Sequence, residues 1–83
     1  MSRPVKRSLT LRQHRTSVSL EDAFWTAFRD IAAEKGRAVN DLAAEIDANR
    51  DMDTGLATAI RLFVLDHYRN AAKHRQNTDV IPT

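Results

Sequence analysis

The chain has no cysteine among its 83 residues, and it has only two glycines and two prolines. Without cysteine it can form no disulfide, no thiol nucleophile and no cysteine-type zinc site, which is compatible with a cytoplasmic location. No apolar run approaches the roughly 20 residues of a membrane span, and the basic N-terminus leads into no apolar core of a signal peptide. The sequence therefore predicts one small domain away from the membrane, of a size whose isolated core is marginal and often gains from a partner.

Acidic residues are missing from residues 1–20, although the whole chain has a formal net charge of only +2. The basic residues of this segment are Arg3, Lys6, Arg7, Arg12 and Arg15. All 11 acids lie in the rest of the chain, which is therefore net negative. Such a split predicts a basic arm that meets a polyanion, attached to a body that does not. A solubilising tail with no partner is the alternative that charge alone leaves open.

Residues 14–20 alternate polar with apolar or β-branched side chains, which predicts a strand with one wet face and one buried face. Residues 8–12 also alternate, but their leucines fall on odd numbers, whereas Val18 and Leu20 are even. One flat strand cannot change parity, so the chain must turn or bulge near residues 13–14. Whether residues 8–12 form a second strand, an arm strand or no regular structure stays open.

Three helices are predicted from the apolar periodicity that follows the strand. Ser19 is a candidate cap for the first helix, Gly36 is placed to end it, and turn residues before Leu56 separate the second from the third. The expected helices span 21–35, 39–50 and 55–73. They belong to a single domain over residues 8–75, between a flexible basic arm at 1–7 and a frayed polar tail at 76–83.

A lone strand needs a neighbour, because unpaired backbone groups are costly when they are buried. Residues 14–20 are therefore expected to pair antiparallel with the same segment of a second copy, about a two-fold axis. Residues 60–65 are also apolar nearly all round, which is more than one face of a small monomer can bury. The side chains expected in this dimer core are Val18, Leu20, Trp25, Phe28, Ile46, Ile60, Phe63 and Val64.

The order of strand, helix, glycine turn and helix over residues 15–50 resembles the ribbon-helix-helix DNA-binding family that includes the Arc and MetJ repressors. The resemblance rests on three segments, which are the run from His14 to Trp25, the turn from Gly36 to Asn40 and the helix from Leu56 to Tyr68. Together they are similar to the short bacterial members of the family. The resemblance implies a mainly α, ribbon-helix-helix fold. One N-terminal strand would pair across a dimer two-fold, and a third helix would follow the two of the family.

In this family a two-stranded ribbon enters the major groove, and the resemblance places Arg15, Ser17 and Ser19 on the face that meets the bases. Arginine can bond both O6 and N7 of guanine, whereas serine hydroxyls restrict the base sequence less. The family also binds a phosphate at the N-terminus of its second helix, which falls here on Val39 and Asn40. The basic residues near the N-terminus supply the other expected phosphate contacts, which are Lys6, Arg7 and Arg12.

The function implied is that of a dimeric, sequence-specific protein that binds double-stranded DNA. It would be a bacterial transcriptional repressor, cytoplasmic and associated with the nucleoid, with assembly of dimers on DNA left open. The alternative is a protein-interaction module, such as the antitoxin of a toxin–antitoxin pair, with a protein partner. A third reading is a small structural dimer whose basic arm is incidental.

No motif supports catalysis, a cofactor or a metal site. The serines lack a glycine-rich elbow, and two glycines cannot build a phosphate loop. His67 and His74 stand two turns apart, roughly 10 Å along a helix, which is too far for one metal ion. Asp47, Asp51 and Asp53 lack the glycine and the downstream glutamate of a calcium loop. We therefore expect a protein that is not an enzyme.

Overall fold

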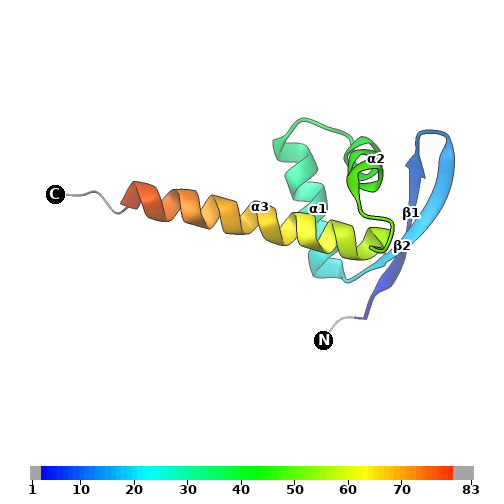
Figure 1. The fold of residues 1–83 in the computed structure, drawn as a ribbon, viewed down its shortest axis with the longest axis horizontal. Helices are drawn as coiled ribbons and strands as arrows, with labels where there is room; N and C mark the ends of the chain where they lie inside the picture. Colours follow the sequence, from blue (N-terminus) through cyan, green and yellow to red (C-terminus); the bar gives the residue numbers. More distant parts are fainter. Residues whose placement is uncertain (1–2, 80–83) are drawn as a thin grey trace.

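A computed structural model of the chain describes the backbone of residues 3–79 and the side chains through Lys73. Two strands precede three helices (Figure 1). The elements are β1 (Val5–Leu11), β2 (His14–Leu20), α1 (Asp22–Glu34), α2 (Val39–Asn49) and α3 (Leu56–Asp79). The fold is mainly helical, as predicted. Among the helices of residues 3–79, none combines the length and the apolarity that crossing a bilayer requires.

β1 and β2 form an antiparallel hairpin within the chain, and Leu11 pairs with His14 beside the turn. Only Arg12 and Gln13 connect the strands, and both have positive φ, at 49° and 78°. Two successive left-handed residues are typical of the type I′ turn, whose twist matches that of the strands. The change of parity in the sequence is therefore a two-residue turn, and residues 8–11 belong to a second strand.

The hairpin corrects two expectations. β2 finds its neighbour in β1 of the same chain, so an unpaired strand no longer requires a second copy. Residues 5–7, expected in a flexible arm over 1–7, belong to β1. Val5 and Arg7 continue the odd-numbered alternation of Leu9, and the dense positive charge of the segment hid that pattern in the sequence.

α1 ends where the sequence predicts a glycine stop. Gly36 has a φ of 65°, its N–H donates to the carbonyl of Ala33, and the N–H of Arg37 donates to that of Ala32. These two hydrogen bonds form a Schellman motif, which satisfies carbonyls at the end of the helix. The chain can then reverse into α2 within a few residues.

α3 is longer than the predicted 55–73, since it runs to Asp79 and takes in part of the segment expected as a frayed tail at 76–83. The added residues are polar, but none of those up to Asp79 is a glycine or a proline that would stop a helix. Residues 80–83 of that expected tail lie outside the described residues.

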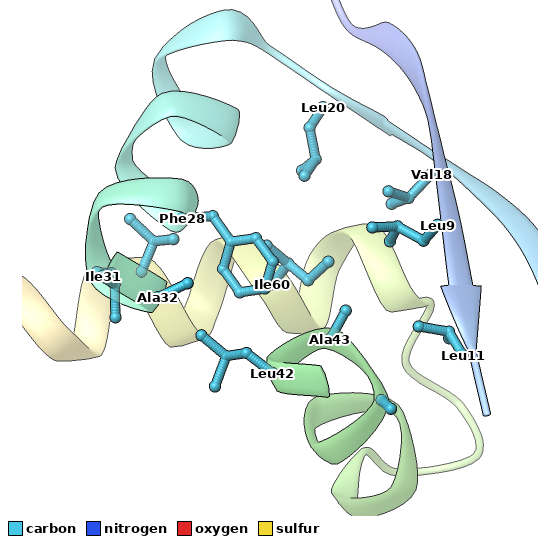
Figure 2. Packing of buried hydrophobic residues seen from close by; sticks show 12 residues of the cluster. Leu9, Leu11, Val18, Leu20, Phe28, Ile31, Ala32, Leu42, Ala43 and Ile60 are labelled. Carbon is cyan, nitrogen blue, oxygen red and sulfur yellow. The ribbon is translucent and has the colours of Figure 1, made fainter. Parts of the chain in front are cut away.

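One hydrophobic core lies between the hairpin and the three helices (Figure 2). Its largest fully buried side chains are Phe28, Leu20, Ile31, Leu42 and Ile60. The Phe28 ring packs edge-on against Phe63, with centroids 6.1 Å apart, and lies 6.3 Å from Trp25. Burying a phenylalanine of this kind stabilises the fold by about 3 kcal/mol, so Phe28 is a central contact between α1 and α3.

The residues expected in a dimer core all contribute to the core of the single chain, and their place in a dimer stays a prediction. Five of them are buried in the core of the single chain, namely Val18, Leu20, Phe28, Ile60 and Val64. Trp25, Ile46 and Phe63 are partly buried against the same core. Periodicity identified buried positions, but it cannot tell which chain covers them.

Candidate nucleic-acid interface

The hairpin has one apolar and one wet face. Directly paired residues of an antiparallel sheet point to the same side of it. On the wet side, the pairs are Lys6 with Ser19, Ser8 with Ser17 and Thr10 with Arg15. All six side chains are exposed, whereas the leucines of β1 and the even-numbered Val18 and Leu20 face the core. The hairpin is a two-stranded ribbon whose wet face, defined by these three pairs, carries two cations and four hydroxyl groups.

The three residues expected to meet the bases lie together on this wet face. Arg15, Ser17 and Ser19 are exposed, and within residues 3–73 their side chains make no hydrogen bond or ion pair. Ser19 does not cap α1, because the N-cap is Glu21 and no side-chain bond caps the helix. All three side chains can therefore meet a ligand without breaking an internal contact.

Sequence reasoning missed Ser8 and Thr10, which complete the wet face. Their signal is the odd-numbered placement of Leu9 and Leu11, which turns the even-numbered residues of the segment outward. That signal identifies Ser8 and Thr10 as surface residues only when residues 5–11 are recognised as a strand. The turn at Arg12 and Gln13 must also be known before β1 can be aligned with β2.

Lys6 and Arg7 lie on opposite faces of β1, although both were expected at phosphates. Lys6 is exposed on the wet face, whereas the Arg7 side chain is only 19% exposed and forms an ion pair with Asp22. The Arg7 guanidinium lies 5.5 Å from the centroid of the Trp25 ring, and its Nε is buried without a hydrogen-bond partner in the part of the chain that the structure describes. Arg7 therefore connects β1 to α1.

Asn40 joins the N-terminus of α2 to the outer edge of β1. Its Oδ1 accepts a hydrogen bond from the backbone N–H of Thr10, at 3.1 Å. Ala38 is the N-cap and has no side-chain cap, so the first-turn amides of α2, including those of Val39 and Asn40, remain as donors. The acidic Asp41 in the same turn weakens their attraction for an anion. These amides lie beside the ribbon. If the ribbon entered the major groove of DNA, they would lie next to the phosphate backbone that borders the groove.

The same bond shows which way the strand backbones point. Because the N–H of Thr10 points away from β2, its partner Arg15 also directs its backbone groups outward, to the other edge of the hairpin. At that edge the guanidinium of Arg61 donates to the carbonyl of Ser19, at 3.2 Å. In the described residues, the backbone groups of Arg15 and Ser17 make no bond at this edge. β2 therefore presents a short, open edge.

Arg61 fixes the junction between β2, α1 and α3. Its Nε donates to Glu21 at 3.0 Å, and its guanidinium lies 5.9 Å from the centroid of the Phe24 ring. The side-chain hydrogen bond from Arg61, together with a backbone hydrogen bond, lowers the pKa of Glu21. This cluster orients the end of the ribbon that carries Ser19.

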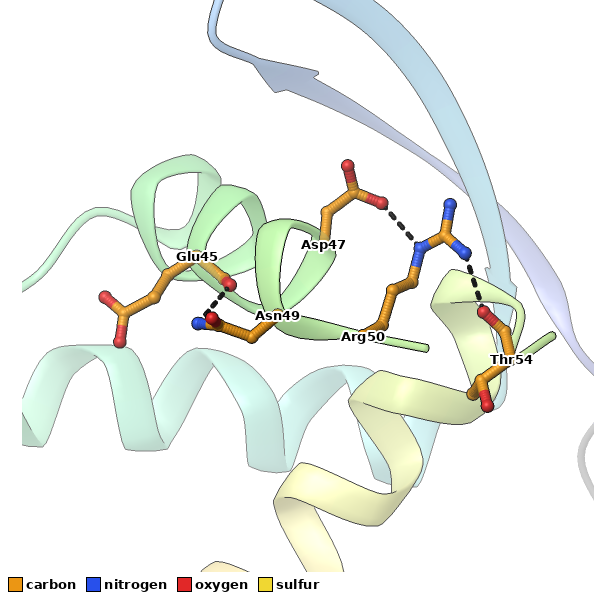
Figure 3. A network of polar contacts seen from close by, with 5 residues as sticks. All are labelled: Glu45, Asp47, Asn49, Arg50 and Thr54. Atoms are coloured by element: carbon orange, nitrogen blue, oxygen red, sulfur yellow. Dashed lines mark hydrogen bonds and ion pairs between the residues drawn. The ribbon is translucent and has the colours of Figure 1, made fainter. Parts of the chain in front are cut away.

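Two of the remaining polar candidates, Asp47 and His67, contact charged side chains. Within the described residues, no group of three or more His, Asp or Glu side chains could hold a metal ion. Asp47 accepts from Arg50 at 2.7 Å, and Arg50 also donates to the carbonyl of Thr54 (Figure 3). His67 lies 3.8 Å from Glu34, and the side chain of His74 is outside the described residues.

Comparison with known families gives one match. The family model described as a ribbon-helix-helix domain matches residues 4–68, from the beginning of the hairpin to the middle of α3. No curated protein matches the chain, and no solved structure does.

Proposed function

The chain belongs to the ribbon-helix-helix family, and from this premise we propose that it is a homodimeric, sequence-specific DNA-binding protein and a bacterial transcriptional repressor. A cytoplasmic, nucleoid-associated location is part of the proposal. The observation that carries it is the wet face of the hairpin, where two cations and four hydroxyl groups are exposed and, among the side chains of residues 3–73, have no partners. Repression would follow from occlusion of a promoter by the bound protein.

The spacing of β-strands supports entry of a two-stranded ribbon into the major groove. Neighbouring strands lie about 4.8 Å apart, and the groove, about 12 Å wide, admits a two-stranded ribbon. Arg15 is the residue proposed to discriminate between bases, since a bidentate contact with guanine contributes about 1–3 kcal/mol of specificity. Ser17 and Ser19 would add hydroxyl contacts that tolerate more than one base.

Phosphate contacts are proposed for the edges and the tip of the ribbon. Lys6 and Arg12 have exposed cationic side chains, and the amides of Val39 and Asn40 lie beside β1. Arg7 leaves the proposed set, because its guanidinium is engaged with Asp22 and Trp25. The basic residues of the segment therefore have two roles in this proposal. Lys6 and Arg12 bind DNA, and Arg7 stabilises the fold.

The proposed dimer uses the open edge of β2. A second copy can add its own β2 there antiparallel, through the free backbone groups of Arg15 and Ser17. The outer strands of the resulting four-stranded sheet would be about 14 Å apart, which is wider than the major groove. The two central β2 strands would therefore enter the groove, and each β1, with Lys6 and the neighbouring α2 N-terminus, would lie along a phosphate backbone.

The antitoxin alternative has support from α3, which extends beyond the body of the molecule (Figure 1) and has three large apolar side chains exposed. A toxin would cover this helix. That alternative predicts fast hydrogen exchange along α3 in the protein alone and protection only with the partner.

The proposal is tested by fluorescence anisotropy of the protein with a mixed-sequence DNA duplex at several salt concentrations. With about six phosphates contacted by a dimer, the slope of log affinity against log salt is expected to be about −5. Absence of binding even at low salt would contradict the proposal. It would leave the basic segment with a role in the fold alone.

A further inference from the structure

The third helix carries an apolar stripe that its own chain leaves uncovered. α3 has 24 residues, and in Figure 1 its C-terminal half projects away from the body, giving a longest dimension of 53 Å. Leu62 is 56% exposed, Leu65 49% and Tyr68 43%. Exposure of three large apolar side chains on one helix marks an interaction surface.

One row of exposed residues on α3, which includes Leu62 and Leu65 but not Tyr68, has the spacing of a helix-pairing seam. The seam consists of Thr58, Leu62, Leu65, Arg69 and Ala72, all of them exposed and separated alternately by four and three residues. This alternation is the a/d pattern by which two helices pack side by side. Ile60 and Val64, which fill the core, lie on another side of α3. The seam is therefore free to receive a second helix.

An open groove of about 540 Å³ runs beside the seam, between the end of α2 and α3. Ile46, Leu62 and Phe63 contribute its apolar lining, and its charged residues are Glu45, Arg50, Asp51, Asp66 and Arg69. A helix lying on the seam would therefore contact α2 as well as α3. Its apolar residues would meet the apolar lining, and charges of either sign would find an opposite charge at the edges of the groove.

We propose that the occupant of this groove is α3 of a second copy, running antiparallel. The seam is complementary to itself in one register, in which Leu62 of each chain packs against the partner's Leu65. Arg69 then lies opposite the partner's Thr58, and the small Ala72 lies opposite the partner's Gly55. Two leucine pairs at the centre supply the apolar contact of a two-fold interface.

Charge supports the antiparallel direction. The turn before α3 contains Asp51 and Asp53, and it exposes 97% of Met52. The second half of α3 carries Arg69 and Lys73, both exposed. In the antiparallel register, these cations lie beside the partner's acidic turn, whereas a parallel pair would place like charges side by side. A second copy therefore suits this surface in shape, apolarity and charge.

This inference gives a surface to the self-association that the proposed function requires, and to that extent it rests on that function. It is nevertheless separate from the ribbon, because none of the seam residues belongs to the hairpin. The experiment is therefore carried out without DNA. Failure of the seam would leave the pairing of β2 strands as the contact that holds the DNA-binding dimer together.

The test uses the absence of native cysteine, which lets a single introduced thiol report one position. Leu62→Cys chains are mixed with tagged Leu65→Cys chains and oxidised gently. The antiparallel register predicts that the mixed disulfide exceeds either homodimeric product by at least severalfold. Thr26→Cys, on the exposed face of α1, controls for random collision. Predominant 62–62 and 65–65 products, or cross-linking no faster than in the control, would overturn the proposal.

A charge-reversal series provides an independent readout by sedimentation equilibrium. Arg69→Asp with Lys73→Asp, and separately Asp51→Lys with Asp53→Lys, should each weaken self-association roughly tenfold. The variant with all four changes should regain most of the original affinity, because its pairs are opposite again. A wild-type chain that stays monomeric at tens of micromolar, or a fourfold variant weaker than both doubles, would overturn the proposal.

Discussion

The backbone N–H of Thr10 and the Oδ1 of Asn40 are joined by a hydrogen bond of 3.1 Å, which attaches β1 to the first turn of α2. Thr10 belongs to the wet face of the ribbon, and Asn40 belongs to the helix terminus proposed to meet a phosphate. The bond therefore links the two parts of the proposed DNA surface. It makes Asn40 a positioning residue as well as a candidate contact.

Substitutions of Asn40 should separate these two roles. Asn40→Ala removes the acceptor and should destabilise the domain by about 1 kcal/mol, since the Thr10 amide loses its partner. Asn40→Asp keeps an acceptor and suits a helix N-terminus, so its stability should stay close to wild type. DNA affinity should fall in both variants. Asn40→Ala loses the side chain that positions the surface and contacts the phosphate, and the carboxylate of Asn40→Asp repels the phosphate. Thermal unfolding and anisotropy measure the two effects, and wild-type affinity in Asn40→Asp would contradict the placement of a phosphate there.

The hairpin turn should show opposite effects on stability and on binding. Arg12 and Gln13 both adopt left-handed backbone, which costs a non-glycine residue about 1 kcal/mol or more. Replacing the pair with Asn-Gly should raise the free energy of unfolding by about 1 kcal/mol and weaken DNA binding, since Arg12 is absent. Gln13→Gly alone is the matched control, expected to stabilise the hairpin without weakening DNA binding. Equal affinity in the two variants would remove Arg12 from the proposed contacts.

The two strand edges should respond differently to proline. The N–H of Thr16 faces β1, whereas that of Ser17 faces the open edge. Thr16→Pro should therefore disrupt the hairpin and lower the thermal midpoint strongly. Ser17→Pro should leave the chain folded but prevent pairing of β2 with a second copy. Circular dichroism and sedimentation without DNA distinguish these results. Self-association of Ser17→Pro should be weakened to what the α3 seam supports alone, and an unchanged affinity would contradict the proposed sheet dimer.

Two adjacent cations should behave oppositely when each is replaced. Lys6→Ala should leave the thermal midpoint unchanged and reduce the salt slope of DNA binding by about 1 for each phosphate that is no longer neutralised. Arg7→Ala should lower stability by about 1 kcal/mol, because the interactions with Asp22 and Trp25 disappear. A reversed outcome, with Arg7 affecting only binding, would contradict the assignment of Arg7 to the fold.

The sequence predicts the strand β2 and the side chains on each of its faces. Alternation over residues 14–20 places Arg15, Ser17 and Ser19 outward and Val18 and Leu20 inward, and the structure has that arrangement. The glycine stop at Gly36 was equally legible, because a left-handed residue is needed there. Local backbone chemistry determines these features, so a local pattern reveals them.

The hairpin was harder to read, because Arg12 and Gln13 are not residues that usually form a type I′ turn. Without that turn, residues 5–7 looked like a charged arm, and Arg7 could not be told from Lys6. The assignment of Phe28 and Ile60 to a dimer core stays a prediction, for a different reason. Hydrophobic periodicity reports burial, and a 12-residue core within one chain satisfies it as well as an interface does.

The central claim is that the wet face of the ribbon reads base sequence, and Arg15 tests it most directly. A specific duplex would be selected from random sequence, and the affinities of wild type and Arg15→Ala for it and for mixed DNA would be measured at one salt concentration. Removal of one bidentate interaction per chain should reduce the preference for the selected duplex by roughly tenfold or more. Mixed-sequence affinity should change much less, and the thermal midpoint should not change. An undiminished preference in a folded Arg15→Ala protein would contradict the account.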